Sequence, residues 1–352
     1  MPVSAYPAPV AETAPAAPPQ VVIIYNGNAG SSQRGANPLA NLLTPAPDAQ
    51  GDTDEPDWVS DARAYIRAET GAAPEIIATQ SEDDAHDAVK SAVARKVPLL
   101  IAAGGDGTLR LAANHLANTE TTLGILPRGT VNVLARELAI PLDDPLAALQ
   151  IALHGKTRRI DSGCVFTQDK PDGTLFLMMA SLGVDATAVD NVDQGVKGFI
   201  GAGAYVMSGL STLAGYDPPA ITLTVRGGDL ASGVPVSRTS NAFLIIITNT
   251  TLYGGDFCAT PDAKLDDGLL DVVVFDAAPG LPAPLQRANF VKQFGLAAIG
   301  QHMSDADIHY VTAANIEVHC DPPTALQVDG DPFGVQANFR IEVMPNALSV
   351  RC

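Results

Sequence analysis

The chain has few cysteines, and none of them has a metal-binding or redox spacing. Its four cysteines are far apart and include no CxxC pair, and its six histidines include no HExxH motif. These absences argue against a structural zinc site and against a disulfide framework. The cysteines are Cys164, Cys258, Cys320 and Cys352. We therefore expect a protein of the reducing cytoplasm, without a signal peptide.

Basic residues are also scarce in this chain. Its 21 Lys and Arg stand against 39 Asp and Glu, which gives a formal net charge of −18 at pH 7. Nucleic-acid binding requires clustered Lys and Arg, so we expect no nucleic-acid partner, and strong electrostatic attachment to anionic lipid is disfavoured as well. The hydrophobic content of 46% indicates a folded protein, and 352 residues suggest two domains. An acidic protein that acts on anionic phosphates commonly uses Mg²⁺ as a mediator.

No apolar run has the ~20 residues that a membrane-spanning helix needs. The nearest candidate is the segment 199–216, but glycines interrupt it at four positions. Phe199, Val206, Leu210 and Leu213 lie on one face of a helix drawn through it. We interpret this segment as a buried or pocket-lining helix, and we predict no transmembrane span.

The order of elements predicts two domains of different class after a Pro- and Ala-rich arm at 1–19, which we expect to be disordered. Strands alternate with helices over 20–155, which predicts an α/β domain with a parallel sheet. Short strands over 156–352 predict an antiparallel β-sandwich, whose last segment may rejoin the first domain. The strands of that sandwich are expected at 158–165, 175–181, 220–226, 241–249, 269–275, 307–311, 314–319 and 338–344, with helices near 192–213 and 284–299.

A glycine-rich turn follows the predicted strand that begins at Leu99. It reads Gly104-Gly105-Asp106-Gly107-Thr108 and precedes a helical segment. Glycine lets the backbone approach a bulky anion, and the N–H groups of the following helix point to the same place. The turn therefore predicts a phosphate-binding loop, while a tight turn with an Asx-type hydrogen bond is the alternative.

Two further turns follow strands of the same predicted sheet. Asn26 begins a turn of small and polar residues, and Pro127-Arg128-Gly129-Thr130 opens another helix. Ligands of parallel sheets bind at the carboxyl ends of the strands, where all three turns lie. Taken alone, the turn at 127–130 is explained better by a plain capped helix. Its convergence with the other two turns favours phosphate binding and makes Thr130 a candidate contact.

The second half of the chain contributes three segments with acidic residues. Tyr253-Gly254-Gly255-Asp256-Phe257 is one, and Lys264-Leu265-Asp266-Asp267-Gly268-Leu269 is another, in which Asp267 and the neighbouring carbonyls could bind Mg²⁺. The third, Val328-Asp329-Gly330-Asp331, could hold a general base. Ordinary turns are the alternative for all three.

Together these segments resemble the diacylglycerol kinase catalytic-domain family, which includes DgkB- and YegS-like bacterial lipid kinases and the related sphingosine and ceramide kinases. The resemblance covers Val21 to Met344. It rests on Gly104–Thr108, on the Gly-Thr-x-Asn-x-x-Ala-Arg stretch at 129–136, and above all on Asp266-Asp267-Gly268-Leu269-Leu270. NAD kinases share the Gly-Gly-Asp-Gly sequence, but their second Asn-Glu motif has no counterpart here.

The resemblance implies an NAD kinase-like α/β domain and a β-sandwich, with the active site in the cleft between them. It implies ATP contacts from Asn26, Thr79, Gly104, Gly105, Asp106, Gly107, Thr108 and Thr130. It also implies an Mg²⁺ site at Asp267 with the carbonyls of Lys264 and Leu269. The base of the family's Asp-Gly-Glu motif falls on Asp331, where Asp replaces Glu; Asp106 is the other candidate for catalysis.

We therefore predict an ATP- and Mg²⁺-dependent kinase that phosphorylates a lipid hydroxyl, such as that of diacylglycerol, a sphingoid base or ceramide. We expect it in the cytoplasm, in transient contact with the membrane surface, and a homodimer is left open. The alternatives are a soluble-substrate kinase of the NAD kinase type and an inactive nucleotide-binding homologue.

Overall fold

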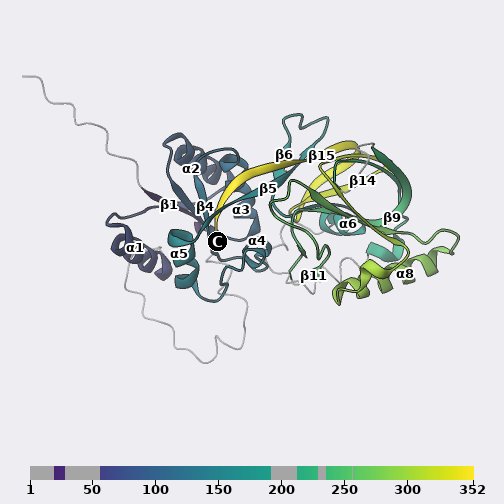
Figure 1. Ribbon diagram of the computed structural model, residues 1–352, viewed down its shortest axis with the longest axis horizontal. Coiled ribbons are helices and arrows are strands. Elements are labelled where there is room, and N and C mark those ends of the chain that lie inside the picture. The colour runs from purple at the N-terminus through teal and green to yellow at the C-terminus, as the bar shows by residue number, and fades with distance from the viewer. Residues whose placement is uncertain (1–19, 28–55, 192–211, 229–234, 256) are drawn as a thin grey trace, which may run out of the picture.

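A computed structural model describes residues 20–27, 56–191, 212–228, 235–255 and 257–352. Figure 1 shows two lobes, and the long strand β15 (Asp331–Arg351) passes from one to the other. The arm at 1–19, the turn after Gly27 and most of the predicted 199–216 helix lie outside the described residues.

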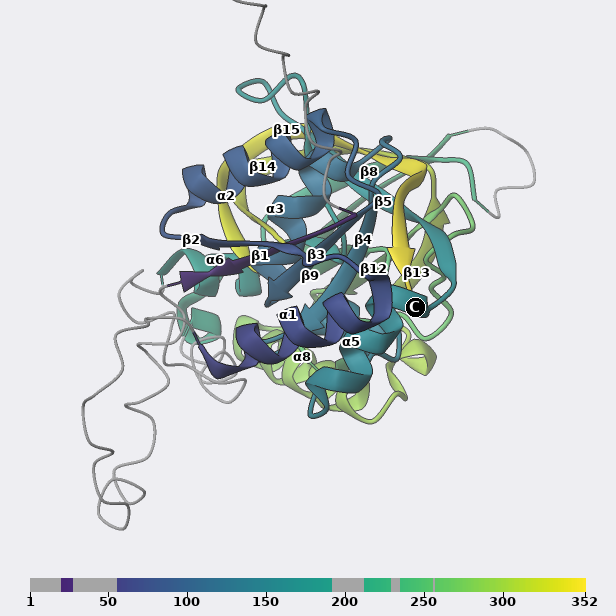
Figure 2. The same ribbon diagram turned by 90° about the vertical axis from the view of Figure 1, so that its left-hand side faces the viewer.

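The first lobe is an α/β unit whose strands are paired in parallel. β1 pairs with β2 and β3, and β3 pairs with β4, so the order is β4-β3-β1-β2. In Figure 2, α2 and α3 lie on one side of this sheet and α1 and α5 on the other. The elements are β1 (Val21–Asn26), α1 (Asp57–Thr70), β2 (Glu75–Thr79), α2 (Glu82–Ala94), β3 (Leu99–Gly104), α3 (Asp106–Leu116), β4 (Thr122–Pro127), α4 (Val133–Glu137) and α5 (Pro145–His154).

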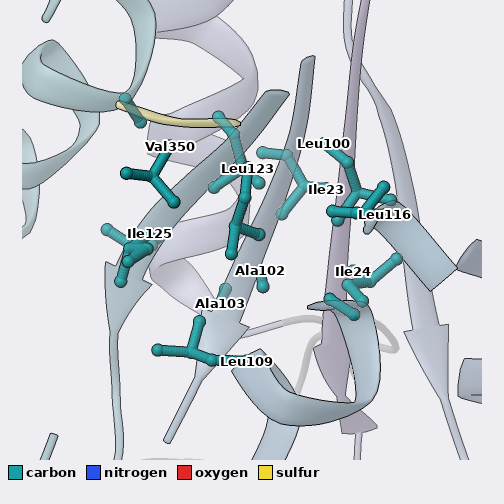
Figure 3. Packing of buried hydrophobic residues seen from close by; sticks show 14 of the residues in the cluster. Ile23, Ile24, Leu100, Ala102, Ala103, Leu109, Leu116, Leu123, Ile125 and Val350 are labelled. Atoms are coloured by element: carbon teal, nitrogen blue, oxygen red, sulfur yellow. The ribbon is translucent and has the colours of Figure 1, made fainter. Parts of the chain in front are cut away.

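The central strands of this lobe are almost entirely apolar because helices cover both faces of the sheet. Figure 3 shows Ile24, Leu100 and Leu123 from three neighbouring strands, with Leu116 of α3 on the same side of the sheet. All four side chains are fully buried. This core fixes the strand ends, and with them the loops that follow at the carboxyl edge.

The second lobe is built from antiparallel strands with one helix-covered face. β9 lies between β7 and β12, while β14 pairs with β7, β8 and β15. The elements are β5 (Thr157–Phe166), β6 (Thr174–Phe176), β7 (Met179–Gly183), α6 (Val184–Asn191), β8 (Ala220–Arg226), β9 (Val236–Thr248), β10 (Leu252–Tyr253), β11 (Phe257–Cys258), β12 (Leu270–Asp276), α8 (Ala283–Ala298), η4 (His302–Ser304), β13 (Ile308–Ala313), β14 (Asn315–Val328) and β15.

Most strands lie where the sequence predicted them, but two are much longer. β8 has the predicted bounds of 220–226, whereas the strands predicted at 314–319 and 338–344 are parts of β14 and β15. Register shifts between His319 and Thr324 let β14 continue past an interruption in its pattern. The end of β15 returns to the first lobe, where Val350 pairs in parallel with Leu123 of β4.

Candidate active site

The carboxyl ends of the four parallel strands form the edge at which the predicted nucleotide residues gather. Asn26 at the end of β1 is paired with Thr79 at the end of β2, and Gly104 of β3 is paired with Pro127 of β4. The Thr79 side chain is buried, and its hydroxyl donates to the Tyr25 carbonyl at 3.1 Å. Thr79 therefore joins β1 to β2 at this edge.

The two loops after β3 and β4 touch through their backbones, which explains two of their glycines. A Cβ on Gly129 would lie 2.5 Å from the Gly105 Cα and 2.8 Å from the Asn132 Oδ1. The Arg128 N–H donates to the Gly104 carbonyl at 2.9 Å, which joins the same loops. Any side chain at position 129 would push them apart. In contrast, a Cβ on Gly107 would meet nothing within 4 Å.

Asp106 links the glycine-rich turn to helix α4. Its carboxylate accepts hydrogen bonds from the N–H groups of Val133, at 3.1 Å, and Leu134, at 3.4 Å. Burial raises the pKa of the Asp106 carboxyl, and these N–H groups act in the opposite direction. The acid of the predicted phosphate loop thus satisfies unpaired donors at the start of another helix.

A polar pocket of about 330 Å³ lies beside the second of these loops. Gly129, Thr130 and Asn132 line it, together with the side chains of Arg128 and Arg136. The Arg128 guanidinium lies 4.7 Å over the Trp58 ring, and the Arg136 Nε donates to the Val131 carbonyl at 2.8 Å. Two guanidinium groups beside a glycine-rich loop suit an anionic ligand. Both arginines belong to the stretch at 127–136, but the sequence alone predicts no role for either.

Helix α3, which follows the glycine-rich turn, contacts the second lobe through two of its side chains. Arg110, one turn after Asp106, forms an ion pair with Asp331 at 2.7 Å. Farther along the helix, the Asn114 Oδ1 accepts from the Leu175 N–H of β6 at 3.3 Å. Asp331 therefore lies at the end of α3 where the glycine-rich turn begins, although 221 positions separate it from Arg110.

Asp329 and Asp331 flank one glycine but have different environments. Asp329 and Gly330 both have positive φ, and they form the two-residue turn between β14 and β15. The buried Asp329 carboxylate accepts from the backbone N–H groups of three residues at 2.9–3.0 Å, and burial raises its pKa to about 6. The donors are Leu177, Met178 and Met179. Asp329 thus holds the hairpin in place, and Asp331 projects from it half-exposed.

A buried network of polar side chains connects this hairpin to the Tyr253 segment. The Gln327 side chain accepts from the Gly330 N–H at 2.7 Å and donates to the Ser181 hydroxyl at 2.6 Å. Ser181 and Tyr253 both donate to the Asp185 Oδ2, and burial raises the pKa of the Asp185 carboxyl. This network could not be predicted from the sequence, because its members come from four separate strands and helices.

The predicted metal loop is held by a buried carboxylate. Asp161 accepts from the Gly268 N–H at 2.7 Å and from the Asn346 N–H at 2.6 Å. Within the loop, Asp267 is exposed, and its Oδ1 accepts from the Leu269 N–H at 3.1 Å. In the described part of the chain, no three His, Cys, Asp or Glu side chains converge on one point. A metal held by Asp267 would therefore rely on backbone carbonyls and water, ligands that Mg²⁺ accepts.

The fold has a close counterpart among solved structures. A structure from Bacillus anthracis superposes with a TM-score of 0.67 at 21% sequence identity, covering 94% of this chain and 96% of its own. Family models agree in the order of domains: the diacylglycerol kinase catalytic domain matches residues 49–165, and the YegS C-terminal NAD kinase beta sandwich-like domain matches residues 178–352.

Proteins with similar sequences identify the family to which this chain belongs. The diacylglycerol kinase of Bacillus subtilis is 32% identical over 260 residues, which are 73% of this chain and 79% of the relative. A probable lipid kinase, YegS-like, of Pseudomonas aeruginosa is 32% identical over 295 residues, 82% of this chain and 89% of the relative. The chain belongs to the diacylglycerol kinase and YegS-like lipid kinase family. It is a phosphotransferase that acts on an alcohol group.

Proposed function

We propose that this protein transfers the γ-phosphate of ATP to the hydroxyl group of a lipid and that it requires Mg²⁺. The observation that carries the proposal is the placement of Asp331 by Arg110, one helical turn after the glycine-rich loop. A phosphate cradle and a half-exposed carboxylate lie at the same end of α3. Phosphoryl transfer needs phosphate positioning, charge neutralisation and a group that accepts the acceptor's proton.

The loops after the parallel strands are proposed to hold ATP. The phosphates would lie against Gly104–Thr108 and Thr130, with Asn26 and Thr79 at the same strand edge. Gly105 and Gly129 support this placement. Because neither has a Cβ, the two loop backbones can lie in contact with each other. Arg128 and Arg136 would add positive charge beside the phosphates.

Asp331 is proposed as the general base. Its carboxylate would accept the proton of the lipid hydroxyl while the oxygen forms a bond to the γ-phosphorus and the bond to the ADP oxygen breaks. Asp106, whose carboxylate caps α4, is the second candidate for this proton transfer. Asp267 with the carbonyls of Lys264 and Leu269 would hold Mg²⁺, which supplies positive charge at the site.

The acceptor is proposed to be a membrane lipid, with diacylglycerol, a sphingoid base or ceramide as the candidates. The second lobe supports this choice because an aromatic cluster, including Phe257, Phe290 and Phe294, lies beside the network that ends at Tyr253. None of the described helices has the length and apolarity required to cross a membrane. We propose a cytoplasmic location with peripheral contact to the bilayer.

One assay tests the proposal and its alternatives. Purified protein is incubated with labelled ATP and Mg²⁺ and with micellar diacylglycerol, sphingosine, ceramide or NAD. We expect label in at least one lipid and none in NAD. Transfer to NAD alone would contradict the lipid proposal, whereas ATP binding without transfer to any acceptor would indicate an inactive homologue.

A further inference from the structure

Helix α8 presents large apolar side chains to solvent on the side that faces away from the core. Within the described residues, seven large hydrophobic side chains are exposed, and four of them belong to α8 and its two ends. They are Leu281, Leu285, Val291 and Ile299, with 41–65% of their surface exposed, and we name them the α8 face. Such clustering on an otherwise soluble lobe marks an interaction site.

The α8 face is more apolar than the outer side of an ordinary amphipathic helix. Leu285 and Ile299 are fourteen residues apart, close to four helical turns, so they share a side. Phe290 and Ala297 on the opposite side are buried against the second lobe. The outer side of the helix therefore exposes large apolar side chains around a single charged one, Lys292, which lies midway between Leu285 and Ile299, whereas the outer side of a surface helix is normally polar.

The charge distribution around α8 differs from that of the whole chain. Residues 277–304 contain no Asp or Glu, although the chain has a net charge of −18. The two cations of this stretch are balanced by neighbours: Lys292 pairs with Asp305 at 2.6 Å, and Arg287 pairs with Asp217 at 3.2 Å. The α8 face is thus nearly neutral and is not repelled by anionic lipid, unlike an acidic surface.

The inner side of α8 continues toward the proposed acceptor side of the active site. Phe294 stacks on Phe257 of β11 with ring centroids 4.9 Å apart, and Phe257 contacts the ring of Tyr253 at 5.8 Å. The Tyr253 hydroxyl donates to Asp185, which joins the network behind the Asp331 hairpin. Figure 1 shows α8 at the outer edge of the second lobe, beyond β11.

We infer that α8 lies on the surface of the lipid bilayer, with Leu285 and Ile299 inserted at the boundary between headgroups and acyl chains. The inference rests on the proposed function, because a kinase of membrane lipids must reach its acceptor in a bilayer. A second copy of this chain is the competing occupant, but two copies with the same charge of −18 repel each other. Insertion of the nearly neutral α8 face into a zwitterionic bilayer involves no such approach of like charges.

The first test measures binding of the full chain to vesicles of zwitterionic phosphatidylcholine by co-sedimentation. The double variant Leu285→Asp/Ile299→Asp should lower the ratio of bound to free protein by about tenfold or more, because each charge opposes insertion. The matched control is Val236→Asp, which changes an exposed valine on β9 and should leave binding unchanged. Circular dichroism and the melting temperature verify that each variant is folded.

A second variant tests the same contact without weakening it. The chain has a single tryptophan, Trp58 on α1 of the first lobe, so Leu285→Trp adds a reporter on the α8 face. Its emission should shift to shorter wavelength when vesicles are added, while the emission of the unaltered protein stays constant. The absence of this shift, or wild-type vesicle binding by the double aspartate variant, overturns the inference.

The remaining outcomes separate this inference from the proposed function. A wild-type dimer that becomes a monomer in the double variant, with vesicle binding unchanged, would assign the α8 face to a second copy and overturn the bilayer contact. Vesicle binding that depends on Leu285 and Ile299, in a protein that phosphorylates no lipid, would support the contact while rejecting the kinase proposal. Undiminished phosphorylation of vesicle lipid by the double variant would reject the contact alone.

Discussion

Arg110 of α3 and Asp331 of β15 are joined by an ion pair of 2.7 Å that connects the two lobes at the candidate active site. The Asp331 carboxylate remains half-exposed beside the guanidinium. It is therefore oriented and still accessible to a hydroxyl group. The pair connects the glycine-rich loop, which precedes Arg110, to the proposed base.

Replacing Asp331 tests the proposed base directly. Asp331→Asn should lower kcat by about 10²–10⁴-fold, the usual contribution of general base catalysis, without changing the fold. Asp331→Glu should retain activity, since it restores the residue of the family's Asp-Gly-Glu motif. The readout is kcat at saturating ATP together with circular dichroism, and near-normal turnover in Asp331→Asn would remove this residue as the base.

Removing the Arg110 guanidinium tests positioning. Arg110→Met should lower kcat less than Asp331→Asn does and should leave the KM for ATP close to its wild-type value. The matched control is Arg226→Met. It removes a surface ion pair, Arg226 with Glu317 at 3.3 Å, that lies away from the site. An equal fall in both arginine variants would contradict a specific role for Arg110.

The two glycines 129 and 107 should respond differently to alanine. Gly129→Ala should cost about 1–3 kcal/mol of unfolding free energy, because its Cβ would overlap the Gly105 backbone. Gly107→Ala has room for a Cβ and should leave stability unchanged while weakening ATP binding, if phosphates lie against it. Urea denaturation and ATP titration by calorimetry measure both effects; unchanged ATP affinity in Gly107→Ala would argue against phosphate contact there.

The double role of Asp106 can be separated by two substitutions. Asp106→Ala should lose about 0.5–2 kcal/mol of stability, because the Val133 and Leu134 N–H groups lose their acceptor. Asp106→Asn retains an acceptor oxygen and should recover most of that stability, but not turnover. Full activity in the Asn variant would leave Asp106 with capping as its sole role.

The Mg²⁺ proposal predicts a change in metal dependence. Asp267→Ala should raise the Mg²⁺ concentration for half-maximal activity on the order of tenfold, since the site would lose its charged ligand. The neighbouring Asp266→Ala is the control, because that side chain is engaged in an ion pair with Arg158 at 2.9 Å. The stabilisation of the melting temperature by Mg²⁺ provides a second measurement, and identical Mg²⁺ responses in both variants would count against Asp267.

The buried Asp271 predicts how stability depends on pH. Burial raises the pKa of Asp271 to about 6, above its ordinary value of 3.8, so the folded protein binds the extra proton between these values. Binding of this proton to the folded state raises the free energy of unfolding. That stabilisation is complete below pH 3.8 and is lost as the pH rises through 6. Asp271→Asn should remove up to about 1.4 kcal/mol per pH unit of that slope. Urea denaturation from pH 4 to 7 measures it, and parallel curves for both proteins would contradict the assignment.

Local patterns allowed much of the site to be predicted from the sequence. Glycines at 105 and 129 are required where two backbones approach, and the Asp-Gly pair at 329–330 is typical of a two-residue hairpin turn. Both features depend on short-range sterics, so a few residues suffice to indicate them. The Asp267 loop was also identified locally, although its proposed metal stays a prediction.

Long-range pairing decided the rest. The sequence does not reveal that the Asp329 carboxylate is buried and accepts three backbone hydrogen bonds from residues 177–179. It also does not reveal that Asp331, two residues later, pairs with Arg110. The sequence raised the return of the last segment to the first domain, but it does not reveal that β15 pairs with β4 and so makes one continuous sheet of both lobes. These contacts join residues more than a hundred positions apart, and their energies depend on packing and desolvation that arise only when the chain has folded. The sequence by itself determined the strands, the turns and the family; the tertiary structure decided which carboxylates became structural and which one remained accessible beside a guanidinium.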